Sequence, residues 1–445
     1  MKRKKGIGLL LAALLGLLLS GCMFSSSPEA MYSLPQLPNE YTELREQIED
    51  IISAGAEYAA PTSGNNIQSV QLIDLDGDRV EEAVAFFRNA TDEKPLKIYI
   101  FRAVGDSYEQ AALLESSGIS IYSIRYVDMN NDGLREIIVG WRVSADIQAL
   151  GVYSIENYEP RLIMSSLYTR YEVLDFDDDL TQEIVLLRSD NQGDPVAEYY
   201  DWEGEDLSVQ STTRLSMTMA ELKSMDIGAL QDGEVALFVT GVAEDTRSIT
   251  DILTYKQGAI ANIVRSDVTG VSSEIFRYIS LEPVDIDGDG VTEVPMPVVL
   301  PNTQEGSEEL FWQVYWLSYN ARGQSETVVS TYHNINEGWY LILPDQWDGQ
   351  IAVRQESGSD ERGTIFSARS SDGTYRDVMG IYTITGNSRE YKATRDDRFV
   401  LKREVGTIYS GVFFDYNDSW RYAISQEEVN QGFRLIAKEW TASDN

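Results

Sequence analysis

The sequence predicts an all-β fold, a β-propeller of about seven blades. From residue 67 onward, short apolar or alternating runs such as 67–73 and 96–103 are separated by turn residues, which is the pattern of strands. One acidic loop also recurs, and its first aspartates are spaced 54, 47, 51 and 59 residues apart. That period is typical of propeller blades, and residues 67–440 divided by about 53 give close to seven units.

The first residues predict export and a lipid anchor. A positive stretch (2–5), an apolar stretch too short for a comfortable membrane span (7–19) and Leu19-Ser20-Gly21-Cys22 follow one another, so residues 1–21 are expected to be a signal peptide. Cys22 is the only cysteine, which excludes internal disulfides and cysteine zinc sites. The arrangement resembles the bacterial lipobox. This resemblance implies cleavage before Cys22, a diacylglycerol on its sulfur and anchoring at the exported face of the cell membrane; a cleaved signal with an incidental cysteine is the alternative.

A tether and a helix are predicted next. Residues 22–38 are rich in serine and proline, as in a mobile tether. Residues 39–55 are expected to form an amphipathic helix, with Asn39 as N-cap and Gly55 just past the end. The helix is expected to pack on the main domain, with a partner-binding helix as the alternative. Its apolar face consists of Tyr41, Leu44, Ile48, Ile51 and Ile52.

The repeated acidic loops have oxygen-bearing side chains at positions 1, 3, 5 and 9. Carboxylates at this spacing, with glycines where the backbone turns, form a set of hard oxygen ligands suited to Ca²⁺. A fifth copy is present only in outline, as Asp226 and Glu234. The four complete copies are Asp74, Asp76, Asp78 and Glu82; Asp128, Asn130, Asp132 and Glu136; Asp175, Asp177, Asp179 and Glu183; and Asp285, Asp287, Asp289 and Glu293.

These loops resemble the FG-GAP or VCBS type of calcium-loop repeat, which occurs in integrin α-subunit heads and bacterial surface proteins. The resemblance covers residues 67–301 and implies five propeller repeats in which the loop joins the first two strands of a blade. It also implies a main-chain carbonyl ligand at position 7, here Val80, Leu134, Thr181 and Val291. Up to four Ca²⁺ sites are therefore expected.

Two other interpretations of the loops are available. An EF-hand would need a bidentate Glu at position 12, where this chain has Ala85, Val139, Leu186 and Met296, so it is excluded. Asx-rich turns without metal are the structural alternative. Carboxylate and glycine content rank the expected affinities as fifth repeat, first, second and third, because the second loop has Asn130 in place of a carboxylate. In the third, Asp178 and Leu180 replace both glycines, so a residue there is expected to be left-handed and strained.

Residues 302–445 predict either two degenerate blades or a small α+β domain. The first interpretation is favoured because residues 339–343 and 351–353 repeat a strand, loop, strand pattern without ligands. A second pair of strands is expected at 399–401 and 407–414. Ser425 and Glu428 form a capping box that predicts a C-terminal helix through Val429, Phe433 and Ile436.

The net charge of −36 excludes nucleic acid as a partner, because the chain offers no basic surface for phosphates.

His333 is the only histidine and is expected to be structural or to lie on the surface. A Ser-His-Asp triad, a Cys-His pair or a histidine-based zinc site could be built only around this one residue. The aromatic clusters near Trp312, Trp339 and Tyr199 are expected in the core, with sugar or protein binding as the alternative. The sequence thus favours a binding or scaffold module for a protein or glycan over an enzyme. A polysaccharide-acting hydrolase or lyase on a propeller fold is the alternative.

Overall fold

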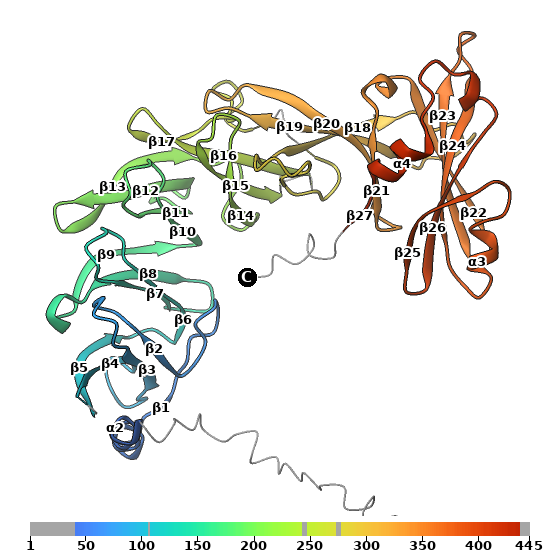
Figure 1. Ribbon diagram of the computed structural model, residues 1–445. Coiled ribbons are helices and arrows are strands. Elements are labelled where there is room, and N and C mark those ends of the chain that lie inside the picture. Colours follow the sequence, from blue (N-terminus) through green and yellow to red (C-terminus); the bar gives the residue numbers. More distant parts are fainter. Residues whose placement is uncertain (1–40, 106, 243–246, 273–276, 437–445) are drawn as a thin grey trace, which may run out of the picture. The chain divides into compact units, whose positions relative to one another are not determined.

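A computed structural model describes residues 41–105, 107–242, 247–272 and 277–436. The signal peptide, Cys22, the tether and Asn39 lie outside this range. The described chain is all-β, with six antiparallel sheets and few helices (Figure 1). The sheets are numbered 1 to 6 in chain order below. No helix in the described ranges combines the length and apolar character that a membrane span requires.

The chain divides into two compact units. The first contains residues up to 61, 67–74 and 78–117, and the second contains 62–66, 75–77 and everything from 118 onward. In the first unit the helix α2 precedes sheet 1, in which β1 and β2 both pair with β3, followed by β4 and β5. The bounds are α2 Thr42–Ser53, β1 Glu57–Tyr58, β2 Val70–Ile73, β3 Glu82–Arg88, β4 Leu96–Val104 and β5 Ser107–Ser116.

The helix α2 confirms the predicted amphipathic helix, although it is shorter than 39–55. Leu44 and Ile48 are buried in a cluster with Ala83, Phe87 and Phe101 of sheet 1, so the apolar face packs on the main domain, as expected. Gly55 follows the helix with φ +101° and bonds its amide to the carbonyl of Ile52. A left-handed glycine of this kind ends a helix at little cost.

Sheets 2, 3 and 4 are four-stranded meanders, in which each strand pairs with the next along the chain. Sheet 2 contains β6 Ser120–Val127, β7 Glu136–Arg142, β8 Gln148–Ser154 and β9 Arg161–Tyr168, with the short 3-10 helix η3 Glu156–Tyr158 before β9. Sheet 3 contains β10 Arg170–Leu174, β11 Glu183–Ser189, β12 Pro195–Glu203 and β13 Asp206–Arg214. Sheet 4 contains β14 Leu222–Ala229, β15 Val235–Val242, β16 Ser248–Lys256 and β17 Ala259–Asn262.

The second strand of each meander reads as a continuous apolar run because it is buried on both faces. In β11, Ile184 and Leu186 join a core cluster with sheet 2, whereas Val185 and Leu187 join a cluster with sheet 4. Alternating side chains of one strand thus contact two neighbouring sheets, as expected for a period of two. Sheets 2, 3 and 4 therefore pack face to face through their apolar side chains.

The last two sheets each have five strands. Sheet 5 contains β18 Val294–Leu300, β19 Phe311–Tyr319, β20 Ser325–Asn334, β21 Trp339–Leu343 and the late strand β27 Phe433–Leu435. Sheet 6 contains β22 Ile351–Gly358, β23 Glu361–Arg369, β24 Tyr375–Ile384, β25 Phe399–Glu404 and β26 Thr407–Phe413. Short helices connect their strands. The helix η5 Asp345–Trp347 lies between β21 and β22, α3 Arg389–Lys392 between β24 and β25, and η6 Asn417–Ser419 and α4 Gln426–Gly432 between β26 and β27.

The structure divides residues 302–445 differently from the sequence prediction. The stretches 339–343 and 351–353 do not form one unit, because β21 pairs with β20 in sheet 5 while β22 begins sheet 6. Between them, Pro344 and the 3-10 turn η5 redirect the chain. The predicted strands near 399 and 407 are present as β25 and β26, but they belong to the same sheet as β22. The described ranges form six sheets, whereas the sequence predicted about seven units.

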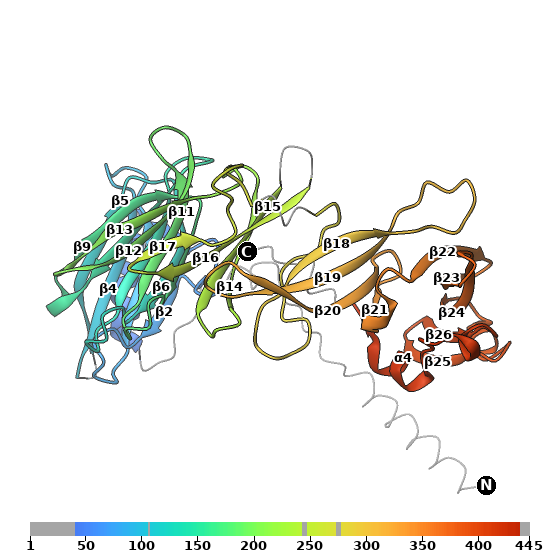
Figure 2. The same cartoon turned by 90° about the horizontal axis from the view of Figure 1, so that it is seen from above.

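The C-terminal helix is present and capped as predicted. The Ser425 hydroxyl accepts from the Glu428 amide and the Glu428 side chain accepts from the Ser425 amide. The helix α4 ends at Gly432, earlier than expected, because Phe433 begins β27 and pairs with Leu341 of β21. Figure 2 shows α4 and β21 side by side, and the chain after the helix adds the edge strand β27 to sheet 5 instead of continuing as a helix to Ile436.

Candidate calcium loops and a polar cavity

Four acidic loops lie between paired backbone segments. In the first three, the loop joins β2 to β3, β6 to β7 and β10 to β11, and the position-9 glutamate is the first residue of the second strand. In the last, Val284 and Glu293 form an isolated antiparallel bridge just before β18. The outlined copy at Asp226 is not a loop. Asp226 pairs with Phe238 in the middle of β14, and a tight turn at 230–234 replaces the acidic segment.

All four loops have the same internal hydrogen bonds. The position-1 aspartate accepts from the position-6 amide: Arg79 to Asp74, Gly133 to Asp128, Leu180 to Asp175 and Gly290 to Asp285, at 2.9–3.1 Å. The position-5 aspartate accepts from the position-7 amide: Val80 to Asp78, Leu134 to Asp132, Thr181 to Asp179 and Val291 to Asp289, at 2.7–2.8 Å. One backbone conformation therefore recurs.

Positions 4 and 6 are left-handed in every loop, with φ between +58° and +91°. Glycine adopts this conformation without strain, whereas a residue with Cβ does so at a cost of about 1–2 kcal/mol. The third loop uses Asp178 and Leu180 at these positions, at φ +64° and +75°. Arg79 and Asn131 are the corresponding exceptions in the first and second loops. The strain predicted for the third loop is thus present at both of its positions.

The position-9 glutamates are buried, with exposed fractions of 2% for Glu82, 3% for Glu136 and 0% for both Glu183 and Glu293. In the last three loops, one carboxylate oxygen accepts from the position-2 amide at 2.7–3.1 Å. Burial raises the pKa of Glu136, Glu183 and Glu293 to about 7, because desolvation disfavours the charged form.

The second oxygen of the glutamate distinguishes two of the loops. In the third loop, Glu183 Oε1 accepts from the Thr181 hydroxyl at 2.9 Å. In the last loop, Glu293 Oε1 is buried and has no hydrogen-bond partner among the described residues. A buried carboxylate oxygen without a partner is costly. Its position beside Asp285, Asp287 and Asp289 fits a cation.

Carboxylate oxygens converge in three of the loops. Within each of three groups, one oxygen per residue lies within 4.8 Å of the others: Asp74, Asp76 and Asp78; Asp175, Asp177 and Glu183; and Asp285, Asp287 and Asp289. In the second loop, Asn130 Nδ2 donates to Asp132 at 2.9 Å. These oxygen sets match the ligand preference of Ca²⁺ or Mg²⁺. The carbonyl ligands expected at Val80, Leu134, Thr181 and Val291 stay a prediction.

Two neighbours of the loops were missed by the sequence reasoning. The Tyr158 hydroxyl donates to Asp76 at 2.9 Å. Asp201 on β12 adds a negative charge near Asp177 and Glu183, and with desolvation it raises the pKa of both. Strand register places Asp201 opposite the loop glutamate, because Ile184 pairs with Tyr200. No spacing rule in the sequence identifies either residue, since both contacts arise only from folding.

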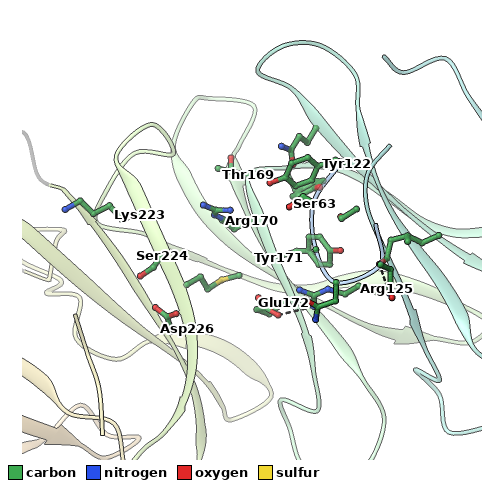
Figure 3. Close-up of a pocket in the computed structure, with 18 residues that line it drawn as sticks. Ser63, Tyr122, Arg125, Thr169, Arg170, Tyr171, Glu172, Lys223, Ser224 and Asp226 are labelled. Carbon is green, nitrogen blue, oxygen red and sulfur yellow. Dashed lines mark hydrogen bonds and ion pairs between the residues drawn. The ribbon is translucent and has the colours of Figure 1, made fainter. Parts of the chain in front are cut away.

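A polar cavity of about 440 Å³ lies in the second unit (Figure 3). It is lined by the first strands of three sheets, β6, β10 and β14, together with the segment 63–66, Gln148 and the Tyr168–Thr169 corner. Figure 3 shows Arg170, Tyr171 and Glu172 on one strand and Lys223, Ser224 and Asp226 on the next. None of these residues was predicted from the sequence to be functional, and Asp226 was expected only in the outlined copy of the acidic loop.

The cavity wall is organised by aromatic and ionic contacts. Arg125 forms a 3.2 Å ion pair with Glu172, and its guanidinium lies 5.1 Å from the centre of the Tyr171 ring. The Tyr168 and Tyr171 rings contact edge to face at 5.2 Å. Such contacts restrict the side chains of the wall.

His333 is structural, as expected. It is buried in β20, its Nδ1 lies 3.1 Å from the Thr331 hydroxyl, and its ring stacks on Tyr340 at 4.9 Å. Burial lowers its pKa to about 3. Most of the aromatic clusters are also core, with Trp316, Trp339, Trp347 and Tyr199 almost fully buried. Tyr278 is exposed and stacks on Trp312 at 6.2 Å.

No known family profile matches the chain, and no curated protein matches it. Among solved structures, the chain is similar to an exo-β-1,3-galactanase from Phanerochaete chrysosporium determined with galactose. That match has 11% identity and a TM-score of 0.24, and it covers 77% of this chain and 81% of that chain. A likeness of this degree does not bear on the function of the present chain.

Proposed function

We propose that this protein is an exported, lipid-anchored binding or scaffold module, and that its sheets form a β-propeller stabilised by up to four Ca²⁺ ions. The observation that carries the proposal is the last acidic loop. There, three aspartate oxygens converge within 4.8 Å beside a glutamate that is 0% exposed and has one unpartnered oxygen. A divalent cation would offset the charge repulsion and the desolvation together.

Calcium is favoured over other metals by the chemistry of the donors. Every candidate ligand is a carboxylate, amide or carbonyl oxygen, and the loops contain neither histidine nor cysteine. Transition metals prefer nitrogen or sulfur ligands, and Mg²⁺ usually keeps several waters instead of a protein cage. A flexible loop that offers about five oxygens is suited to the larger Ca²⁺ ion.

The propeller is supported by the organisation of the sheets. Sheets 2 to 4 are consecutive antiparallel meanders. Side chains of sheets 2 and 3 form one core cluster, and side chains of sheets 3 and 4 form another. The three strands that line the polar cavity are each the first strand of their sheet. In a propeller the first strand of every blade faces the central channel, so this cavity would be part of that channel.

The anchor and the binding role have separate support. Anchoring relies on the order of charged, apolar and Leu-Ser-Gly-Cys segments before residue 23. A non-catalytic role is favoured because the one histidine is buried and its pKa is lowered to about 3, and because Glu172 in the cavity is ion-paired with Arg125. A polar cavity on a rigid β scaffold is then the natural place for a ligand.

Thermal unfolding with and without calcium tests the metal proposal. With Kd about 0.1 mM and free Ca²⁺ about 1 mM, each site adds roughly 1.4 kcal/mol to the free energy of unfolding. We expect EGTA to lower the melting temperature by several degrees and added Ca²⁺ to restore it. Glu293→Gln should reduce this shift. The matched control is Asp146→Asn, which neutralises an exposed acid outside the loops and should leave the shift unchanged. An unchanged melting temperature in EGTA would refute the calcium proposal.

A further inference from the structure

The third acidic loop has an acidic residue opposite its glutamate, whereas the other three loops do not. The strand that begins at or just after each position-9 glutamate pairs with the next strand, and the register of that pair gives the residue opposite the glutamate. In chain order of the loops, the opposite residues are Arg102, Ser154, Asp201 and Ser318. Only the third of these, Asp201 of β12, carries a negative charge.

Asp201 shares one face of sheet 3 with Glu183. Side chains alternate between the two faces of a strand, so Glu183 lies on the face of Val185 and Asp201 on the face of Tyr199. Val185 and Tyr199 pair with each other and belong to the same core cluster. Like charges directly opposite on one face repel. Because Glu183 is 0% exposed, water screens this repulsion poorly.

Two further polar atoms near this pair lack partners. The buried Oδ1 of Asp177 and the hydroxyl of Tyr199 have no hydrogen-bond partner among the described residues, and Tyr199 is only 1% exposed. Burial raises the pKa of Tyr199, and the charges of Glu183, Asp201 and Asp177 raise it further, so its hydroxyl lies among these carboxylates. Buried polar atoms without partners are costly. All of these groups offer oxygen, which is the ligand atom that Ca²⁺ prefers.

Asp201 also has an oxygen to offer and is reached from solvent. Its Oδ1 accepts from the Trp202 amide at 2.6 Å, and a carboxylate has a second oxygen that can bind another group. Asp201 lines a cavity of about 450 Å³ together with Asp179 and Thr181 of the third loop. A hydrated cation can therefore approach the loop and Asp201 from the same side.

We propose that Asp201 is an additional ligand of the cation in the third loop, bound directly or through one water. Asp175, Asp177 and Glu183, whose oxygens lie within 4.8 Å of one another, would then gain a further negative charge. Ligand charge is one of the factors that set the affinity of a calcium loop. The third loop consequently binds Ca²⁺ more tightly than its own nine residues predict, in spite of its two strained positions. This inference rests on the calcium proposal.

Calcium titration of the lipid-free protein, residues 23–445, tests the role of Asp201. A background variant isolates the third loop by neutralising one exposed aspartate in each of the other loops: Asp78→Asn, Asp132→Asn and Asp289→Asn. Calorimetry with Ca²⁺ measures the affinity, and Tb³⁺ luminescence excited through tyrosine reports binding near Tyr199. In this background, Asp201→Asn should weaken the binding of both ions by about tenfold or more.

The matched control is Glu203→Gln. It removes the same charge from an exposed side chain two residues further along β12 and should change the affinity by less than about twofold. If Asp201→Asn and Glu203→Gln have equal effects, Asp201 acts only through its distant charge, and the proposal is overturned.

Thermal unfolding gives a second readout, which a purely structural role of Asp201 would not produce. In EGTA, Asp201→Asn removes the repulsion with Glu183 and should melt at a higher temperature than the wild type. In saturating Ca²⁺ the order should reverse, because tenfold weaker binding removes about 1.4 kcal/mol of stabilisation by the ion. The same order in both conditions would overturn the proposal. This comparison needs no background variant, so it decides the question even if that variant does not fold.

The titration separates this inference from the calcium proposal. If neither the wild type nor the background variant binds Ca²⁺, both proposals fail. If the wild type binds Ca²⁺ but the background variant does not, the third loop holds no ion and only this inference fails. If both bind Ca²⁺ and Asp201→Asn leaves the affinity of the background variant unchanged, the calcium proposal stands and the role of Asp201 is overturned.

Discussion

At the scale of single residues, two buried ionisable side chains of this protein, Glu293 and His333, lie in contrasting environments. Glu293 has an oxygen without a partner beside three aspartates, so its environment favours a bound cation. His333 has a hydroxyl neighbour and two aromatic rings, Trp316 and Tyr340, around it. Its environment favours the neutral imidazole, because burial disfavours the charged form.

His333 therefore makes stability depend on pH. Its pKa is lowered to about 3 in the folded protein from 6.5, so below pH 6.5 the unfolded chain takes up a proton that the folded chain does not. Stability is complete above pH 6.5 and falls by about 1.4 kcal/mol per pH unit as the pH decreases toward the folded-state pKa. Between pH 6.5 and 5 the expected loss is about 2 kcal/mol.

Urea unfolding at several pH values measures this effect. In His333→Gln the contribution is absent, so the variant should lose about 2 kcal/mol less than the wild type between pH 6.5 and 5. Comparing slopes removes the constant cost of the substitution itself. Parallel stability curves for the two proteins would contradict the assignment.

At the scale of elements, the third loop keeps the shared conformation at the expense of strain. Leu180 is 72% exposed and has φ +75°, so it contributes little packing while its Cβ opposes the left-handed backbone. The other three loops have glycine or a long polar side chain at this position.

Leu180→Gly should consequently stabilise the protein. Relief of strain is worth about 1–2 kcal/mol, and the greater flexibility of unfolded glycine removes about 0.5–1 kcal/mol of that gain. We expect a net increase of about 0.5–1 kcal/mol in the free energy of unfolding, measured by chemical denaturation with Ca²⁺ present. Leu180→Ala is the control. It keeps the Cβ and should give no gain, so equal stabilisation by alanine would disprove the strain argument.

The loops were predictable from the sequence because their ligands are local. Nine consecutive residues fix the positions of Asp285 and Glu293, and the chain before and after them reads as strands. Asp201 was not predictable, since it approaches Glu183 only through the pairing of β11 with β12. The cavity was missed for the same reason: Arg170 and Lys223 are 53 residues apart, and each looks like an ordinary strand residue in isolation.

The outlined copy at Asp226 shows where spacing misleads. Asp226 and Glu234 keep the eight-residue interval of the other loops, yet β14 continues through Asp226 and pairs with β15. Residues 222–229 favour a longer strand because Met225 packs in the core shared with sheet 3. The alternating pattern of burial, set by tertiary packing, overrides the local spacing.

At the scale of the whole molecule, the net negative charge limits how the protein can attach to a membrane. A net charge of −36 repels anionic lipid, so electrostatic attraction cannot hold the protein on a membrane. Stable attachment would then need apolar groups, and two or more acyl chains are sufficient. The proposed lipidation at Cys22 would supply a membrane contact that does not depend on charge.

Cell fractionation tests this dependence. Expressed in a bacterium, the wild type should be found in the membrane fraction and be released by detergent, whereas Cys22→Ser should lose its lipid attachment. The variant should either appear in the soluble exported fraction or retain an uncleaved signal, which its larger mass on denaturing gels would reveal. Radiolabelled palmitate should enter the wild type only. Palmitate incorporation in Cys22→Ser would disprove lipidation at this residue.

In three of the acidic loops, the position-8 residue forms a backbone hydrogen bond with the preceding repeat. The amides of Arg135, Gln182 and Thr292 donate to the carbonyls of Leu75, Met129 and Ala229, respectively, at 2.6–3.0 Å. The side chains at this position have nothing in common, because the amide alone makes the contact. Any amino acid except proline can therefore occupy the position. In a chain with a single cysteine, it offers places for a spectroscopic label that reports on each of these backbone contacts.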